Sequence, residues 1–238
     1  MERVLGVIPA RGGSKSIPRK NIAMLAGRPL LSYTCDAALN SRVLTRVVLS
    51  TDDEEIAGVG RKSGVEVPFL RPGQLANDET PSVDVAEHAV HWLAEREGWQ
   101  ADVVVLLQPT SPLRQAGHID EALGRMQDTD ADTVVSVMPV PHRFSPYNVM
   151  TFEGGLLQDF WQDRFGFDRF RRQNLPVLYA RNGPAVLASR ASLILQSHTF
   201  YGARVAPYLM TEEESVDIDT DFDLRLAEWL IGQRPESF

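Results

Sequence analysis

The chain has 238 residues, of which 43% are apolar and 24% are charged, a composition typical of a globular protein with one large domain, or one domain and an arm. Its formal net charge of −8 argues against general nucleic-acid binding, and its single cysteine, Cys35, excludes a disulfide framework or a cysteine-based zinc site. No apolar run approaches the ~18–20 residues of a membrane span, and the apolar start that ends at Pro9 is too short for a signal peptide. We therefore expect a cytoplasmic protein with neither nucleic-acid nor membrane partners.

Charged residues are distributed unevenly along the chain. Residues 1–30 contain six basic residues and one acid, whereas residues 211–223 contain seven acids and no base. Lysine is rare, yet Lys15 and Lys20 both fall in the basic segment. A compact ammonium group suits phosphate, and carboxylates suit a divalent cation. The two segments together predict a polyphosphate ligand held with a divalent metal ion.

Apolar runs and helix-start signals alternate along the chain. The run 4–8 predicts a buried strand, and Pro29 predicts the first residue of a helix. Residues 51–54 resemble a capping box that begins a helix, with Gly64 suited to follow its end. Further strands are predicted at 47–49, 65–67, 103–107, 133–138, 185–187 and 203–209, and further helices from 80, over 119–126 and from 220.

This alternation predicts an α/β fold with a doubly wound, mostly parallel sheet. Such sheets bind ligands outside the carboxyl ends of their strands. The loops after Ile8, Leu49, Leu107 and Met138 are therefore expected to line the site.

The regular pattern stops between residues 139 and 173. Prolines, aromatic residues and arginines predominate there, which predicts an inserted arm. Arginines among aromatic residues also occur in proteins that bind single-stranded nucleic acid, but acids largely balance the bases of this segment. The α/β domain then comprises residues 1–138 and 174–238.

A glycine-containing loop, PARGGSKS at 9–16, follows the first predicted strand. It is not a Walker A loop, because that motif requires a glycine where Ser14 stands, and the dinucleotide-binding pattern G-x-G-x-x-G is absent. Glycines let backbone N–H groups turn toward an anion, and Arg11, Lys15 and Lys20 supply cations nearby. The loop predicts a phosphate-binding site, with a solvated basic turn as the alternative.

Several short motifs follow one another along almost the whole chain. They are IPARGGSK at 8–15, PRKN at 18–21, LSTDD at 49–53, LRP at 70–72, LA at 75–76, QPTSPLR at 108–114, RQ at 172–173, NG at 182–183 and SVDIDT at 215–220. In these motifs and their order the chain resembles the acylneuraminate cytidylyltransferase family, the CMP-sialic acid synthetases and related CMP-nonulosonate synthetases.

The resemblance implies a Rossmann-like nucleotidyltransferase fold and a reaction that joins a nonulosonic acid to CTP, giving a CMP-sugar and pyrophosphate with Mg²⁺ as cofactor. The anomeric hydroxyl attacks the α-phosphorus in line, so the protein mainly positions the reactants and offsets charge. It also implies a homodimer in which residues 139–173 act as the dimerisation arm and reach toward the partner's active site.

The family roles carry over to the matching positions. The nucleotide would be bound by Arg11, Gly12, Gly13, Ser14, Lys15, Lys20, Asn21, Arg71 and Ser82, the last two at the cytosine. The sugar would be bound by Gln108, Arg172 and Asn182, and the metal by Asp217 and Asp219. The catalytic set would be Arg11, Lys20 and Asp219, with the proton acceptor open between Asp219 and a water on the metal. On a strand, residues 217 and 219 would face the same way, which suits a shared ion.

The chain departs from the family at residues 179–187, YARNGPAVL, where members often have R-x-N-G-A-I-Y. The departure lies on the sugar side of the site, so N-acylneuraminate, legionaminate and pseudaminate all remain candidate sugars, with a GMP-legionaminate product as a nucleotide alternative. Two other classes of function also stay open. One is a nucleotide-sugar-dependent glycosyltransferase with Asp52 and Asp53 as its metal motif, although a capping role explains these residues equally well. The other is a non-catalytic nucleotide-sugar sensor.

Overall fold

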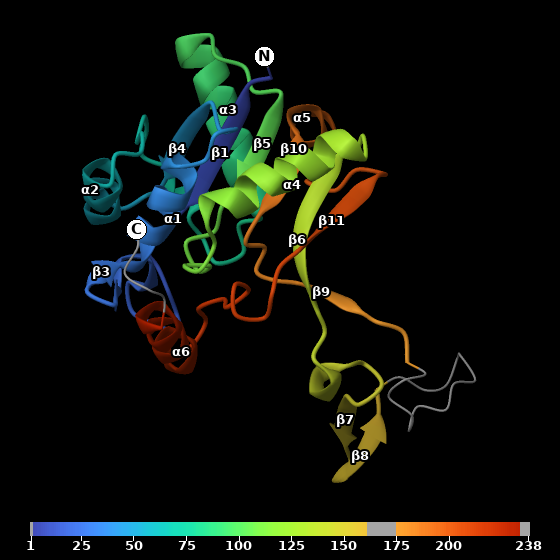
Figure 1. The fold of residues 1–238 in the computed structure, drawn as a ribbon. Coiled ribbons are helices and arrows are strands. Elements are labelled where there is room, and N and C mark those ends of the chain that lie inside the picture. Colours follow the sequence, from blue (N-terminus) through green and yellow to red (C-terminus); the bar gives the residue numbers. More distant parts are fainter. Residues whose placement is uncertain (1, 161–174, 234–238) are drawn as a thin grey trace.

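A single mixed β-sheet forms the centre of the fold in the computed structural model, which describes residues 2–160 and 175–233. Its strands are β1 (Val4–Pro9), β4 (Arg46–Ser50), β5 (Val103–Leu106), β6 (Thr133–Pro139), β9 (Tyr179–Arg181), β10 (Leu187–Arg190) and β11 (Val205–Leu209). They lie in the order β11-β6-β10-β5-β1-β4, and β9 pairs with β6 (Figure 1).

Five of these seven strands run in the same direction. β1 pairs in parallel with β4 and β5, and β11 pairs in parallel with β6. β10 lies between β5 and β6 and is antiparallel to both, so β5 and β6 run in the same direction. β9 is antiparallel to β6. The predicted α/β fold with a mostly parallel sheet is confirmed, but the pattern of residues does not predict the reversal of β10.

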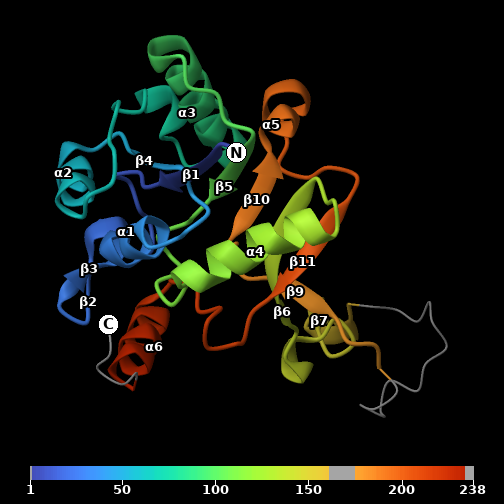
Figure 2. The same ribbon diagram turned by 45° about the horizontal axis from the view of Figure 1, so that its top comes forward.

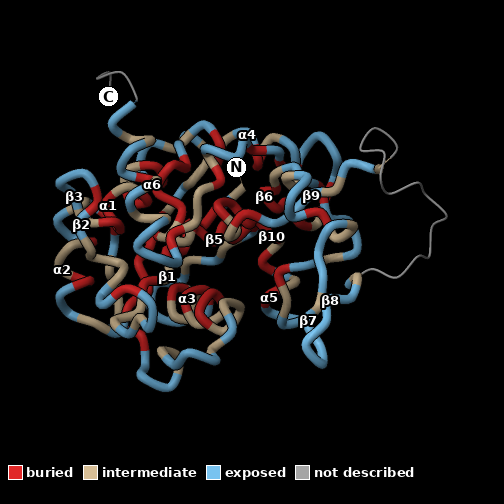
Figure 3. The backbone as a smooth tube through the Cα atoms, turned by 90° about the horizontal axis from the view of Figure 1, so that it is seen from below, coloured by how far each residue is buried: buried red, intermediate tan, exposed pale blue. Residues whose placement is uncertain are grey.

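Helices cover both faces of the sheet. They are α1 (Leu30–Leu39), α2 (Glu54–Lys62), α3 (Ser82–Glu97), α4 (Ala116–Asp128), α5 (Ala191–Ser197) and α6 (Asp221–Gly232). Val103 and Val105 of β5 pack in one apolar cluster with α1, α2 and α4, whereas Val104 and Leu106 pack in another with α3 and α5. Figure 3 shows the buried strands between α4 on one side and α3 and α5 on the other. Burial on both faces explains why the central strands are continuous apolar runs.

Three short elements lie between β1 and α1: η1 (Lys20–Ile22) and the two-stranded ribbon of β2 (Met24–Leu25) and β3 (Arg28–Pro29). The helix predicted to begin at Pro29 begins at Leu30, with Pro29 as its N-cap. A further short helix, η2 (Gly73–Leu75), lies before α3. None of the helices in the described ranges is long and apolar enough to cross a membrane.

The N-cap predicted for α6 is confirmed by the structure, whereas the N-cap predicted for α2 is wrong. Thr220 and Asp223 form the predicted capping box of α6. At α2 the predicted cap, Thr51, is wrong: the N-cap is Asp53, whose carboxylate accepts a hydrogen bond of 3.0 Å from the Ile56 amide. Gly64 follows the end of α2 with a φ of 89°, a conformation that strongly favours glycine. The strand predicted over 65–67 is reduced to one bridge between strand β4 and Glu66.

The segment after β6 leaves the sheet. It contains η3 (His142–Phe144) and an antiparallel hairpin of β7 (Met150–Glu153) and β8 (Leu156–Asp159), which forms its own two-stranded sheet. Figures 1 and 2 show this hairpin beyond the end of β6, away from the helices that cover the sheet. Residues 161–174, which include the remainder of the predicted arm (161–173), lie outside the described residues. The division into a domain and an arm stays a prediction.

Candidate functional site

A cavity of about 400 Å³ opens where β1 and β5 end. Loops after these two strands line it, as predicted, together with the segment that leads into α3, whereas the loops after β4 and β6 do not. Ten of the predicted site residues line it: Arg11, Gly13, Ser14, Lys15, Lys20, Asn21, Arg71, Ser82, Gln108 and Asp219. Three others, Gly12, Asp217 and Asn182, lie outside the lining, and Arg172 lies outside the described residues.

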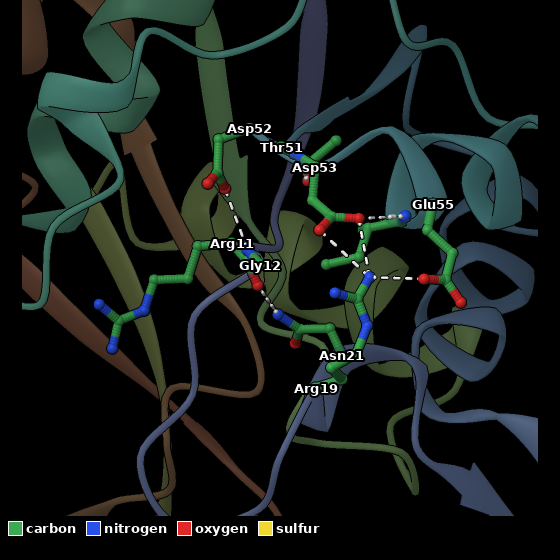
Figure 4. Close-up of polar contacts among 9 residues, drawn as sticks. Arg11, Gly12, Arg19, Asn21, Thr51, Asp52, Asp53 and Glu55 are labelled. Atoms are coloured by element: carbon green, nitrogen blue, oxygen red, sulfur yellow. Dashed lines mark hydrogen bonds and ion pairs between the residues drawn. The ribbon is translucent and has the colours of Figure 1, made fainter.

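Hydrogen bonds with Asp52 and Asn21 fix the backbone of the glycine loop (Figure 4). The Gly12 amide donates a hydrogen bond of 3.0 Å to the Asp52 carboxylate, and the Asn21 side chain donates one of 2.9 Å to the Arg11 carbonyl. A Cβ atom at position 12 would lie 2.9 Å from a carboxylate oxygen of Asp53 and 3.1 Å from its Cβ atom, so the Asp53 side chain would have to shift. Glycine at position 12 therefore allows the loop to approach the segment that follows β4 closely.

Arg19 ties the same loop to helix α2. It stands in a left-handed conformation with a φ of 52°, and its guanidinium lies 2.9 Å from Asp53 and 2.8 Å from Glu55. Asp53 therefore caps α2 and binds Arg19, while Asp52 holds Gly12. Both carboxylates that the glycosyltransferase alternative needs for a metal have structural partners. Sequence reasoning missed Arg19, whose only signal is its place in the PRKN motif.

Lys20 joins the basic loop to the acidic segment near the end of the chain. Its ammonium group donates a hydrogen bond of 2.7 Å to the Ile218 carbonyl and lies 3.0 Å from the Asp219 carboxylate. Ile218 is fully buried in a small apolar cluster with Ile17 and Ala227, which fixes the two segments against each other. The basic and acidic segments singled out in the sequence therefore meet at the cavity.

Asp217 lies behind the cavity wall. One of its carboxylate oxygens is buried without a hydrogen-bond partner in the described structure. Burial raises the pKa of this carboxyl, against the opposing effect of the Thr110 hydroxyl. The backbone packs closely here: a Cβ atom on Gly183, whose φ is 110°, would lie 3.2 Å from the carboxylate. Residues 217–219 do not form a strand. The prediction that Asp217 and Asp219 face the same way because side chains alternate along a strand is therefore wrong.

An unpartnered buried carboxylate oxygen fits a cation. Mg²⁺ takes oxygen ligands and usually binds only one or two carboxylates, with phosphates and water completing its shell. Of the two carboxylates predicted for the metal, the exposed Asp219 lines the cavity and Asp217 lies outside its lining, so their joint role stays a prediction. In residues 2–160 and 175–233, no three His, Cys, Asp or Glu side chains converge in the manner of a metal site built wholly by the protein.

Arg71 also lines the cavity. It is almost fully buried, and its backbone amide donates a hydrogen bond of 2.7 Å to the Thr51 carbonyl. Its Nε and one Nη have no hydrogen-bond partner in the described structure, the nearest carboxylate oxygen being 3.8 Å away on Asp52. Burial lowers the pKa of this guanidinium. Unpartnered N–H groups at a cavity wall are suited to an acceptor on a ligand.

The two described residues predicted at the sugar differ in their surroundings. Gln108 lines the cavity, and its carbonyl accepts a hydrogen bond of 3.1 Å from the fully buried Arg114, which sequence reasoning missed. Arg114 also donates to the Ala185 carbonyl at 2.7 Å, and burial lowers its pKa to about 9. Asn182 is buried, with its amide bonded to Ser136 and Ser215. Its contact with a sugar stays a prediction.

Comparison with known proteins shows the family to which the whole chain is related. The cytidylyltransferase family model matches residues 5–234. The chain is 36% identical over 239 residues to a CMP-N,N'-diacetyllegionaminic acid synthase of Legionella pneumophila, covering 99% of each chain. It is also 36% identical over 220 residues to an N-acylneuraminate cytidylyltransferase of Streptococcus agalactiae, covering 91% of this chain but only half of that protein.

Solved structures with low sequence identity share the fold. A CMP:2-keto-3-deoxy-manno-octonic acid synthetase complexed with CTP has a TM-score of 0.73 at 16% identity, covering 98% of this chain and 99% of that one. A 4-diphosphocytidyl-2C-methyl-D-erythritol synthase of Anaerococcus prevotii has a TM-score of 0.64 at 11% identity, covering 98% and 97%. The extent of the family match and the 36% identity over the full chain show that this protein belongs to the cytidylyltransferase family.

Proposed function

We propose that this protein transfers CMP from CTP to a nonulosonic acid and releases pyrophosphate. The observation that carries the proposal is the meeting of the basic segment (residues 1–30) with the acidic segment (residues 211–223) at one cavity, through Lys20, Ile218 and Asp219. The names of the Legionella and Streptococcus relatives, one acting on legionaminate and one on neuraminate, support a nonulosonic acid as the sugar.

The reaction needs charge neutralisation and orientation more than covalent chemistry. The anomeric oxygen forms a bond to the α-phosphorus, the bond from that phosphorus to the pyrophosphate oxygen breaks, and the hydroxyl loses its proton. Arg11, Lys15 and Lys20 line the cavity and would offset the charge of the phosphates. Asp219 also lines the cavity, and we propose its carboxylate as the acceptor of the proton.

Asp217 and Asp219 would hold Mg²⁺. The buried, unpartnered oxygen of Asp217 supports this role, because a cation would compensate a carboxylate that has lost its hydration. When bound, Mg²⁺ neutralises phosphate charge and helps pyrophosphate to leave. Lys20, already paired with Asp219, keeps that carboxylate next to the glycine loop.

The two ends of the cavity would bind the two substrates. We propose that the unpartnered N–H groups of Arg71 and the hydroxyl of Ser82, the first residue of α3, recognise the cytosine, since both residues line the cavity. Gln108 would contact the sugar near its reacting hydroxyl. Arg172, outside the described residues, would bind the sugar carboxylate, for which a guanidinium is well suited.

Pyrophosphate release tests the reaction. With CTP and Mg²⁺ we expect release when N-acetylneuraminate, N,N'-diacetyllegionaminate or pseudaminate is supplied, and none when the sugar is omitted. Chelation of Mg²⁺ by EDTA should abolish release, and excess Mg²⁺ should restore it. A preference for GTP over CTP would contradict the proposed nucleotide. Consumption of a CMP-sugar without pyrophosphate would instead indicate a glycosyltransferase, and tight binding without turnover would indicate a sensor.

We also propose that the protein is a homodimer joined through the segment after β6. This segment exposes large apolar side chains at Phe144, Phe152, Leu156, Leu157 and Phe160, and a patch of this kind is a common mark of an interface. Sedimentation should give the mass of a dimer for the native chain and of a monomer for the Phe152→Ser, Leu156→Ser variant. Phe222→Ser, equally exposed on α6, is the control and should stay dimeric. A native monomer would contradict the proposal.

A further inference from the structure

The Asp78 carboxylate forms ion pairs with both basic side chains of the glycine loop, Arg11 and Lys15. One carboxylate oxygen lies 2.5 Å from the Arg11 guanidinium, and the other lies 2.6 Å from the Lys15 ammonium group. All three side chains line the cavity, although Asp78 belongs to a different segment of the chain, between Arg71 and Ser82. A carboxylate therefore stands where the proposed function needs a phosphate.

We propose that Asp78 is an internal competitor for the phosphate groups of the nucleotide. It occupies Arg11 and Lys15 in the nucleotide-free protein, yields them when CTP binds, and recovers them when pyrophosphate leaves. The proposal rests on the proposed function and adds to it a residue that sets nucleotide affinity and product release.

The occupant of the site sets the direction of the exchange: bound phosphate displaces Asp78, and Asp78 returns once the phosphate has left. Triphosphate and pyrophosphate carry several negative charges against one on Asp78, so they form stronger charge-assisted hydrogen bonds with the same cations. The ion pairs of Asp78 are solvent-exposed and hence weak, because the Lys15 side chain is 81% exposed and that of Asp78 is 40% exposed. Asp78 is nevertheless attached to the cavity wall, so it meets these cations at a high effective concentration once phosphate departs.

Arg11 and Lys15 keep the Asp78 carboxylate ionised and oriented toward the glycine loop. Hydrogen bonds from Lys15 and Arg11 lower the pKa of its carboxyl, so it is ionised at neutral pH. No other described carboxylate pairs with either cation. Glu79, the next residue, is also exposed but forms no ion pair with a described cation, which makes it a matched control.

The test compares Asp78→Asn with Glu79→Gln by calorimetric titration in Mg²⁺ buffer. Both variants remove one negative charge, but only Asp78→Asn removes the competitor. We expect Asp78→Asn to bind CTP and inorganic pyrophosphate about three- to tenfold more tightly than the native protein, as the loss of two exposed ion pairs implies. Binding of CMP, which lacks the terminal phosphates, should change little, and Glu79→Gln should bind all three ligands as the native protein does.

Kinetics give a second measurement. In Asp78→Asn, KM for CTP should fall and inhibition by pyrophosphate should strengthen by similar factors. Equal or weaker binding of both ligands by Asp78→Asn would overturn the inference, as would the same gain in Glu79→Gln, which would reveal a general effect of charge. If the native protein binds neither CTP nor pyrophosphate, the proposed function fails with it. If the native protein binds CTP but Asp78→Asn binds it no better, only the role of Asp78 fails.

Discussion

The Asp217→Asn variant should lose about 10³-fold in kcat while retaining its fold, because several kcal/mol of charge stabilisation in the transition state depend on a metal ligand. Asparagine has the shape of aspartate but lacks the charge that would hold Mg²⁺. Steady-state pyrophosphate release measures the loss, and titration of Mg²⁺ against the CTP-bound protein should show weakened metal binding. Asp221→Asn, an exposed carboxylate in the first turn of α6, should change both quantities little. Undiminished turnover in Asp217→Asn would remove the metal assignment.

The same variant has a predicted effect on stability. Because burial raises the pKa of Asp217, the native state binds more protons than the unfolded state between the ordinary and the raised pKa. Stability from this group therefore falls as pH rises through that window, and the cost persists at neutral pH. Asp217→Asn should melt at the same temperature as the native protein or higher at pH 7. A large drop in melting temperature would mean that the carboxylate has a structural partner instead of a catalytic role.

The Lys20→Met variant should lose about 10²–10³-fold in kcat/KM for CTP. Methionine retains an unbranched apolar stem, one atom shorter than lysine, but removes the charge that would face the phosphates and the bonds to Ile218 and Asp219. Pyrophosphate release at varied CTP concentration measures the effect. Lys62→Met, on the exposed surface of α2, is the control and should behave as the native protein. Native kcat/KM in Lys20→Met would contradict the phosphate role of this lysine.

The central strands were accessible from the sequence because their cause is local. The run from Val103 to Leu107 is buried on both faces, and apolar residues in series record that burial directly. The cap of α6 was equally accessible, since Thr220 and Asp223 are three residues apart. The direction of β10 was not, because it depends on where the chain returns after the hairpin, which no short pattern of residues records.

In the predicted site, too, features with a local cause could be predicted from the sequence, whereas contacts between distant segments could not. The glycine loop could be recognised because its basic residues lie together in the sequence. The contacts that shape it come from elsewhere: Asp52 and Asp53 hold it from the end of β4, and Asp78 binds it from the segment before α3. Each of these carboxylates, read in the sequence, resembles a cap or a solvated surface residue. Only the tertiary structure reveals their partners.

The bonds from Lys20 to Ile218 and Asp219 join residues 198 and 199 positions apart. The ribosome adds about 5–20 residues per second, so it completes the glycine loop roughly 10–40 s before the segment that completes the site. During synthesis, Lys20 therefore exists for this time without its partners Ile218 and Asp219. A nascent chain that stops before residue 217 contains all seven described strands of the sheet but neither aspartate of the proposed metal site. Activity is thus expected only after residues 217–219 have been synthesised.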